Sequence, residues 1–178
     1  MDLHAIRLDI SRRLSRGVAD RRSAFRTPAL ATASGARTVV LRSWDGPSRT
    51  LTIHSDVRAA KIAEVAAHPP VALHVWDAGA QVQLRLWGDA HRSNEAEADA
   101  AWARLHPGSR ASYRAALVPG TVLDDPAALP LLDEADARQN FAVLAVVVHT
   151  IEWLHLAPDG HRRARFTSAP EQAVWLVP

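Results

Sequence analysis

The chain alternates short strand-like segments with turns that are too short to carry a crossover, and this feature limits its fold more than any other. The clearest case is RTVVLRSWDGPSRTLTIHSD, residues 37–56, in which apolar and β-branched runs flank the turn signal WDGPS. Parallel strands need a connection of a dozen or more residues, whereas a short turn joins antiparallel neighbours. The sequence therefore predicts antiparallel pairing and argues against parallel βαβ layers.

Hydrophobic periodicity predicts helices at the corners of this strand meander. Apolar residues recur at three- and four-residue steps over residues 2–22, which indicates an amphipathic N-terminal helix. A second helix is expected to begin at the N-cap Asp56 and to stop before Pro69, and a third, over 93–117, to be interrupted near Pro107. We expect strands over 28–33, 37–44, 49–54, 70–76, 81–91, 141–148, 149–156, about 163–168 and 172–177.

These elements predict one α+β domain over residues 1–178, built on an antiparallel barrel of six to eight strands with peripheral helices. Residues 118–140 are rich in Pro and Asp and are expected to form an irregular connection.

Composition excludes several classes of function. The 178 residues include no cysteine, so disulfides, thiolate metal sites and a cysteine nucleophile are excluded, and a cytoplasmic protein is expected. The N-terminus lacks the apolar stretch of a signal peptide, and the longest apolar run, 141–148, is too short to span a bilayer, so no membrane partner is expected. Net charge is only +2, which argues against a nucleic-acid partner.

Basic and hydroxyl side chains cluster around the first predicted hairpin and the helix after it. Arg37 and Arg42 border one strand, and Ser55, Arg58 and Lys61 follow the next, where a helix N-terminus favours anions. Lys61 is the one lysine among 21 basic residues. The cluster predicts a phosphate site; the alternative is a set of solvated charges in an arginine-rich chain. Because Arg37 and Arg42 are five residues apart, both reach one phosphate only if the strand twists or bulges, or if one side chain wraps around the strand edge.

Two stretches carry a resemblance to a known family. They are RTVVLRSWD…LTIHSDVRAAKIAEVAAHPPVALHVWDAGAQVQLRLWGDAHR and HTIEWLHLAPDGHRRARF. Over about residues 27–170 the chain resembles the FMN-binding split-barrel family related to pyridoxamine 5'-phosphate oxidase. The resemblance implies an antiparallel split β-barrel, a homodimer, and FMN at the interface between the two chains.

The resemblance also implies which residues hold the phosphate end of the flavin. Residues 37–42 match the family's R-x-V-L-L-K strand, so the backbone of Thr38, Val39 and Val40 is expected along the flavin ring and the two arginines near the phosphate. Lys61 matches the family's phosphate-binding lysine. Ser55 takes the place of a threonine and His54 that of a tyrosine, while Arg58 substitutes for an arginine that the family has at Ala60.

Three further residues are implied at the flavin ring. Gln83 matches a glutamine that contacts the ring, and Arg165 matches an arginine near it, where it would stabilise negative charge on reduced flavin. The family's tryptophan position falls on Trp153 or Leu154, and we take Leu154 as the cofactor contact.

The substrate side departs from the family. In the family's Y-x-x-x-R-P-x-x-S run this chain has Trp102 for tyrosine and His106 for arginine, and it keeps only Ser109, one place earlier. A further family arginine is His161. Imidazoles lack the bidentate fork that suits a phosphate, so this pocket is expected to take a substrate other than a vitamin B6 phosphate.

The resulting prediction is an FMN-dependent oxidoreductase acting on a small molecule. Flavin supplies the redox chemistry, so the chain needs to bind, orient and tune it. A flavin- or haem-binding carrier or sensor without turnover, a true pyridoxamine 5'-phosphate oxidase, and a deazaflavin protein are the alternatives. The nine histidines show no metal-ligand spacing, so no metal is expected.

Overall fold

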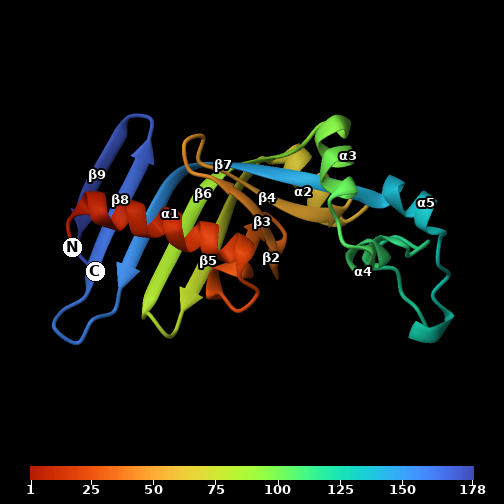
Figure 1. Cartoon of the computed structure of the whole chain (residues 1–178), viewed down its shortest axis with the longest axis horizontal. Helices are drawn as coiled ribbons and strands as arrows, with labels where there is room; N and C mark the ends of the chain where they lie inside the picture. Colours follow the sequence, from red (N-terminus) through yellow and green to blue (C-terminus); the bar gives the residue numbers. More distant parts are fainter.

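The computed structural model describes residues 1–178 and contains one nine-stranded antiparallel sheet with five α-helices (Figure 1). The strands are β1 Ala29–Thr32, β2 Gly35–Thr38, β3 Leu41–Asp45, β4 Thr50–Asp56, β5 Pro70–Asp77, β6 Val82–Arg92, β7 Phe141–His155, β8 Arg162–Ser168 and β9 Glu171–Leu176. The α-helices are α1 Leu3–Ala19, α2 Ala60–Ala67, α3 Glu95–Ala103, α4 Pro107–Arg110 and α5 Glu134–Ala137. Short 3₁₀ turns occupy Ala24–Arg26 (η1), Ala111–Tyr113 (η2), Pro126–Ala128 (η3) and Arg138–Asn140 (η4).

The sheet is a barrel that is split at one seam. Its strands run in the order β2-β1-β5-β6-β7-β4-β3, with β8 and β9 continuing from β7. The two end strands, β2 and β3, are joined by Val39 and Val40 alone. Three Cα steps span at most about 11 Å, so the sheet must curl until its edges lie close together. No ladder joins these edges, and the predicted antiparallel split barrel is therefore confirmed as an open one.

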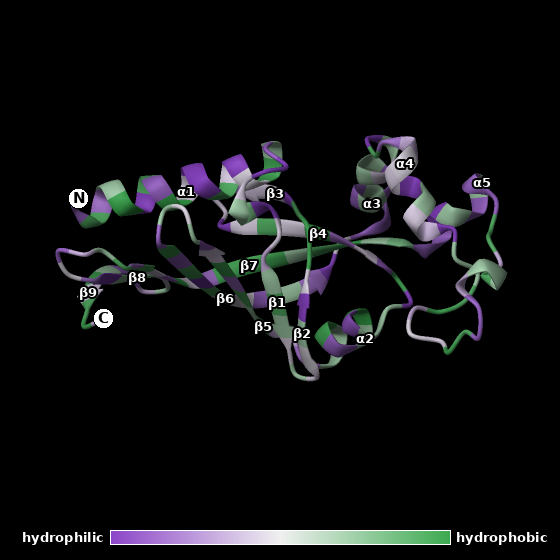
Figure 2. Cartoon of the chain, turned by 90° about the horizontal axis from the view of Figure 1, so that it is seen from below, coloured by the Kyte–Doolittle hydropathy of each residue, from purple (hydrophilic) through white to green (hydrophobic).

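The inner face of the curled sheet forms the core. Side chains on β4, β5 and β6 alternate between buried and accessible, as expected for strands with one face on a core. Helix α1 adds Ile6, Ile10 and Leu14, and α2 adds Val65, to the same cluster of 24 buried residues. The two helices approach the strands from opposite sides, and polar and apolar residues alternate along α1 (Figure 2).

Strand β7 is one strand where the sequence predicted two. It runs from Phe141 to His155 and pairs with β4, β6 and β8. Its ladder with β6 shifts between Trp87 and Gly88, so a bulge lies close to the predicted break between residues 148 and 149. The bulge bends the strand without interrupting it, and the expected division into 141–148 and 149–156 is wrong.

Two other predicted boundaries are also corrected. The expected strand 37–44 is two strands, because the chain leaves one edge of the sheet at Thr38 and joins the other at Leu41. Helix α2 begins at Ala60, and Asp56 is the last residue of β4 rather than an N-cap. The Asp56 carboxylate instead accepts hydrogen bonds from the backbone and guanidinium of Arg58.

The remaining elements separate to the two ends of the molecule. Helices α3, α4 and α5 gather at one end, whereas β8, β9 and both termini lie at the other (Figure 1). Residues 118–140 contain only short helical turns, as predicted for an irregular connection. None of the helices combines the length and the apolar character needed to cross a membrane.

Candidate functional site

Two of the predicted phosphate residues lie together beside helix α2. The Arg37 guanidinium is 3.4 Å from the Glu64 carboxylate and donates to the Thr32 hydroxyl at 2.5 Å. Lys61 is half-buried on the same helix and makes no hydrogen bond or ion pair. Burial, and then the neighbouring charge of Arg37, lower the pKa of Lys61. The charges of Asp56 and Glu64 act in the opposite direction but form no ion pair with Lys61, so the ammonium group is a partly desolvated cation without a direct anionic contact.

The other two residues near the start of α2 are already engaged. Ser55 is buried, and its hydroxyl donates to the Asp56 carbonyl at 3.0 Å. The Arg58 guanidinium binds the Asp56 carboxylate and donates to the carbonyl oxygens of Ala115 and Ala116. Arg58 thus ties the connection after η2 to the sheet, and every one of its guanidinium nitrogens has a partner.

Arg42 stands apart from this group. The β3–β4 ladder shifts between Leu41 and Ser43, so Arg42 is the extra residue of a β-bulge. A bulge, one of the arrangements that the spacing allowed, is present, but Arg42 lines a cavity of about 640 Å³ that neither Arg37 nor Lys61 lines. This cavity, called the α3 cavity below, is lined by Arg42, Ser43, Thr50, Thr52, His54, His91, Ser93, Glu97, Ala101, Arg104, Leu105, Val143, Ala145 and Val147.

The residues predicted at the flavin ring share the outer face of β6, β7 and β8. Gln83 is paired across the ladder with Leu154 and lies within hydrogen-bond distance of His74, at 3.2 Å. Arg165 is paired with Glu152 and donates two hydrogen bonds to its carboxylate, at 2.9 and 2.7 Å.

Glu152 is the centre of a cluster that sequence reasoning missed. Its side chain is 5% exposed and accepts hydrogen bonds from Arg85 and Arg163 as well as Arg165. Burial raises the pKa of Glu152, but the three guanidinium groups outweigh burial and lower the pKa to about 2. The alternation of Arg163 and Arg165 along β8 is the one local signal, and only the cross-strand register shows that they meet Glu152 and Arg85.

Strand register places the phosphate group and the ring group on opposite faces. Arg37 is in one row with Leu30, Leu73 and Leu86, which are core residues of the inner face. Gln83, Leu154 and Arg165 belong to the outer face. In the segment that ends β2 and leads to β3, Thr38 is exposed, Val39 is buried and Val40 is half-buried. One chain therefore does not gather all the predicted cofactor residues into one pocket.

The predicted substrate residues are also separated. Trp102 packs against Tyr113 and Phe141, with ring centroids 5.8 and 5.3 Å apart, and belongs to a small core under α3. His106 caps α4 by accepting the Gly108 N–H, and Ser109 lies within that helix. His161 is exposed and directly precedes β8, the strand that lies at the other end of the molecule from α3 and α4 (Figure 1). Trp102 thus belongs to α3, His106 and Ser109 belong to α4 and its cap, and His161 lies apart from all three.

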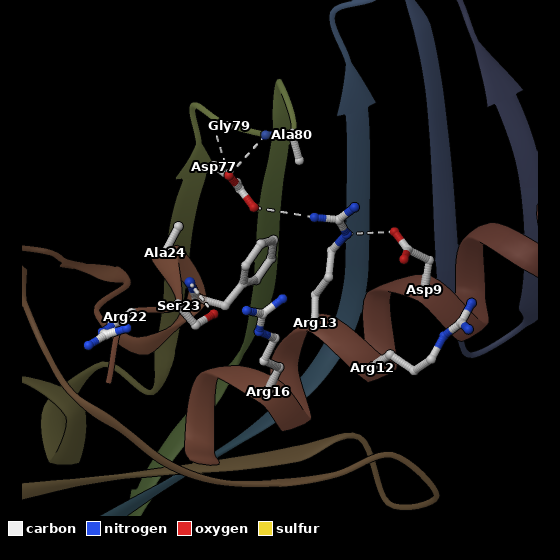
Figure 3. A pocket seen from close by; sticks show the side chains of 11 residues that line it. Asp9, Arg12, Arg13, Arg16, Arg22, Ser23, Ala24, Asp77, Gly79 and Ala80 are labelled. Carbon is white, nitrogen blue, oxygen red and sulfur yellow. Dashed lines mark hydrogen bonds and ion pairs between the residues drawn. The ribbon is translucent and has the colours of Figure 1, made fainter. Parts of the chain in front are cut away.

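A second cavity, of about 650 Å³, contains none of the predicted site residues. It lies between the end of α1, η1 and the β5–β6 turn, and four arginines line it: Arg12, Arg13, Arg16 and Arg22 (Figure 3). Arg13 is held between Asp9 and Asp77, and Arg16 pairs with Asp20. Much of the positive charge of this cavity is thus neutralised by the chain itself.

Comparison with known protein families finds a similarity within the first half of the chain. Residues 10–93 match the model of the pyridoxamine 5'-phosphate oxidase FMN-binding domain. The match includes Arg37, Arg42, Ser55, Lys61 and Gln83, and it ends before Leu154 and Arg165. No curated protein matches this chain in sequence.

Solved structures give the fold of the whole chain. A pyridoxamine 5'-phosphate oxidase-related, FMN-binding protein from Nostoc punctiforme is 21% identical, with a TM-score of 0.79 and full coverage of both chains. PhzG from Burkholderia lata, in complex with tetrahydrophenazine-1-carboxylic acid, is 19% identical, with a TM-score of 0.74 over 96% of this chain and 91% of its own. A heme-binding protein from Mycobacterium smegmatis is 19% identical, with a TM-score of 0.52 over 89% of this chain and 58% of its own.

The solved structures share one architecture although their printed ligands differ, so the likeness establishes the fold of this chain and not its reaction. Residues 10–93 are similar to the pyridoxamine 5'-phosphate oxidase FMN-binding domain, and over its whole length the chain has the split-barrel fold of the solved structures that it resembles.

Proposed function

We propose that this chain binds FMN and acts as an FMN-dependent oxidoreductase on a small organic molecule. The observation that carries the proposal is Lys61, a half-buried ammonium without an anionic partner, set beside Arg37 within the segment that matches the FMN-binding family. Burying a cation costs free energy unless an anion accompanies it, and a flavin phosphate supplies one.

The phosphate is held by Lys61 and Arg37, with the hydroxyl groups of Thr32 and Ser34 nearby. Both hydroxyls now donate to Glu64, and their hydrogen bonds lower the pKa of that carboxyl. A bound phosphate would pair with Arg37 while the Glu64 carboxylate kept its own contact with that guanidinium. Arg58 and Ser55 support the segment, since their polar groups are bound within the chain.

The flavin ring lies against the outer sheet face, where Gln83 offers an amide and Arg165 a positive charge. When bound, FMN supplies the transfer of a hydride or of single electrons. Arg165 would then favour a negatively charged, reduced ring, and Glu152 holds its guanidinium in place.

A homodimer completes this site. The phosphate group and the ring group occupy opposite faces of one chain, so a flavin held by Lys61 and Arg37 of one protomer needs the outer face of the partner. Trp76 and Val174 expose apolar surface on that face, 39% and 41% of each residue, which suits an interface.

The visible spectrum of the purified protein tests the cofactor. We expect flavin absorption bands, and FMN as the compound released on denaturation. A Soret band would assign haem instead, and a colourless protein that takes up no FMN would overturn the proposal. Multiple-turnover oxidation of NAD(P)H by the FMN-loaded protein separates an enzyme from a carrier, which would be reduced once or not at all.

A further inference from the structure

The α3 cavity lies on the outer sheet face, away from Lys61. Its floor is one patch of neighbouring rows, in which Thr52 is paired with Ser43 and Ala145, and Ala145 with His91. Its wall is the end of α3 and the segment after it. The floor and wall combine hydroxyl groups with an apolar surface formed by Ala101, Leu105, Val143, Ala145 and Val147. Such a mixture suits a small organic molecule with a polar end.

Two polar atoms of this cavity are buried and have no partner. They are Nε of Arg42 and Nδ1 of His54. Arg42 makes no ion pair, and burial lowers its pKa. A buried polar group left without a hydrogen bond destabilises the protein, and more so when it is charged. The cavity therefore has an unused, partly desolvated guanidinium that an anion would satisfy.

The charge of the lining indicates a monoanion. Arg42 and Arg104 are positive and Glu97 is negative, so these groups sum to one positive charge. Burial and the charge of Arg42 lower the pKa of His54 to about 4, and its ring is neutral at pH 7. A carboxylate matches one guanidinium with two parallel hydrogen bonds, and its single negative charge equals the net positive charge of the lining.

We infer that the α3 cavity binds a small organic carboxylate, whose carboxylate group pairs with Arg42 and whose apolar body lies on β7 and Leu105. That this carboxylate is the substrate rests on the proposed function. Its binding to the α3 cavity does not, because the contacts with Arg42 and Leu105 do not require FMN. It names a substrate class distinct from the phosphate esters of vitamin B6.

Three probes that share a naphthalene ring test the charge requirement: 2-naphthoate, the neutral 2-naphthamide of the same shape, and the dianionic 2-naphthyl phosphate. Binding is measured by isothermal titration calorimetry on the full chain, with and without FMN. We expect 2-naphthoate to bind at least about tenfold more tightly than either of the other probes, because only it forms a charge-matched pair with Arg42. Equal affinity for naphthoate and naphthamide, or preference for the phosphate, would overturn the inference.

Arg42 variants locate the contact. In Arg42→Gln the affinity for 2-naphthoate should fall about tenfold or more, while that for 2-naphthamide stays within about twofold; Arg42→Lys should recover part of the loss. Arg12→Gln, a change in the other arginine-lined cavity, is the matched control and should bind like wild type. Unchanged naphthoate binding by a folded Arg42→Gln protein contradicts the inference.

FMN titrated into the same samples distinguishes the two proposals. Binding of naphthoate without any uptake of FMN would reject the flavin function and leave the cavity assignment standing. Binding of FMN without any binding of naphthoate would reject the cavity assignment and leave the flavin function standing. Displacement of naphthoate by one equivalent of FMN would assign Arg42 to the cofactor and overturn the inference.

Discussion

At the scale of single residues, His54 links the α3 cavity to pH. Its burial and the charge of Arg42 lower its pKa from 6.5 to about 4. Between these values the unfolded chain binds a proton that the folded chain does not, so stability falls as pH falls, by at most about 1.4 kcal/mol per pH unit. His54→Phe, which keeps a ring against Phe141, should lose less stability than wild type from pH 6.5 to 4. Urea unfolding followed by tryptophan fluorescence measures this, with exposed His68→Gln as the control; equal slopes for wild type and His54→Phe would show that His54 does not titrate as described.

Glu152 gives a second residue-level test, with a different pH window. Because the pKa of its carboxyl is lowered to about 2, its contribution is complete above its ordinary pKa of 4.5 and is lost as pH falls toward 2. Glu152→Gln should reduce the free energy of unfolding at pH 7 by about 1–3 kcal/mol, and the difference from wild type should shrink below pH 4.5. Denaturant unfolding across this range checks it. Glu171→Gln, which breaks the exposed pair with Arg7, should change stability by less than about 1 kcal/mol; an equal effect of the two variants would contradict the central role of Glu152.

At the scale of elements, the bulge between β6 and β7 depends on one glycine. A Cβ atom on Gly88 would lie 2.1 Å from the Val147 carbonyl oxygen and 2.9 Å from Cα of Val148, and neither backbone atom is free to move within the sheet. Gly88→Ala should therefore destabilise the fold by about 2 kcal/mol or more, as thermal and urea unfolding would show. Gly79→Ala in the β5–β6 turn meets only the Asp77 side chain at 3.4 Å and should be close to neutral. A Gly88→Ala protein as stable as Gly79→Ala would mean that β7 is free to shift at this point.

At the scale of the whole molecule, the proposed site requires two chains. We expect the protein to have the mass of a dimer by light scattering after gel filtration. Trp76→Glu, on the outer face, should weaken both the dimer and FMN binding without unfolding the chain, because it places a charge in the interface. Val122→Glu, in the exposed connection, is the control. A monomer that binds FMN as tightly as wild type would contradict a shared site.

Local pattern predicted most of this architecture, and pairing between distant residues explains most of what it missed. The alternation in 49–54 and 81–91 places β4 and β6, because one face of each strand is buried and the other is not. The same alternation cannot show that β4 pairs with β7, about ninety residues away, since register is decided by which faces pack together. Thus the antiparallel class was predictable, whereas the seam between β2 and β3 was not.

In the candidate site, too, local sequence predicted single residues, whereas contacts between distant residues could not be predicted. Lys61 was recognisable as a rare residue type in a matching segment, but the pairing of Arg37 with Glu64 depends on where α2 packs. The separate place of Arg42 depends on a single bulge, which no local propensity specifies. The Glu152 cluster needs the registers of three strands at once.

The most direct test of the central claim is whether Lys61 recognises the phosphate of FMN. Dissociation constants of FMN and riboflavin, measured by flavin fluorescence on wild type and Lys61→Ala, separate the phosphate from the ring, and Arg12→Ala controls for the loss of a distant charge. We predict that Lys61→Ala weakens FMN about tenfold or more and leaves riboflavin within about twofold, since only FMN carries the phosphate. Equal losses for the two flavins, or no loss for FMN, would contradict the assignment.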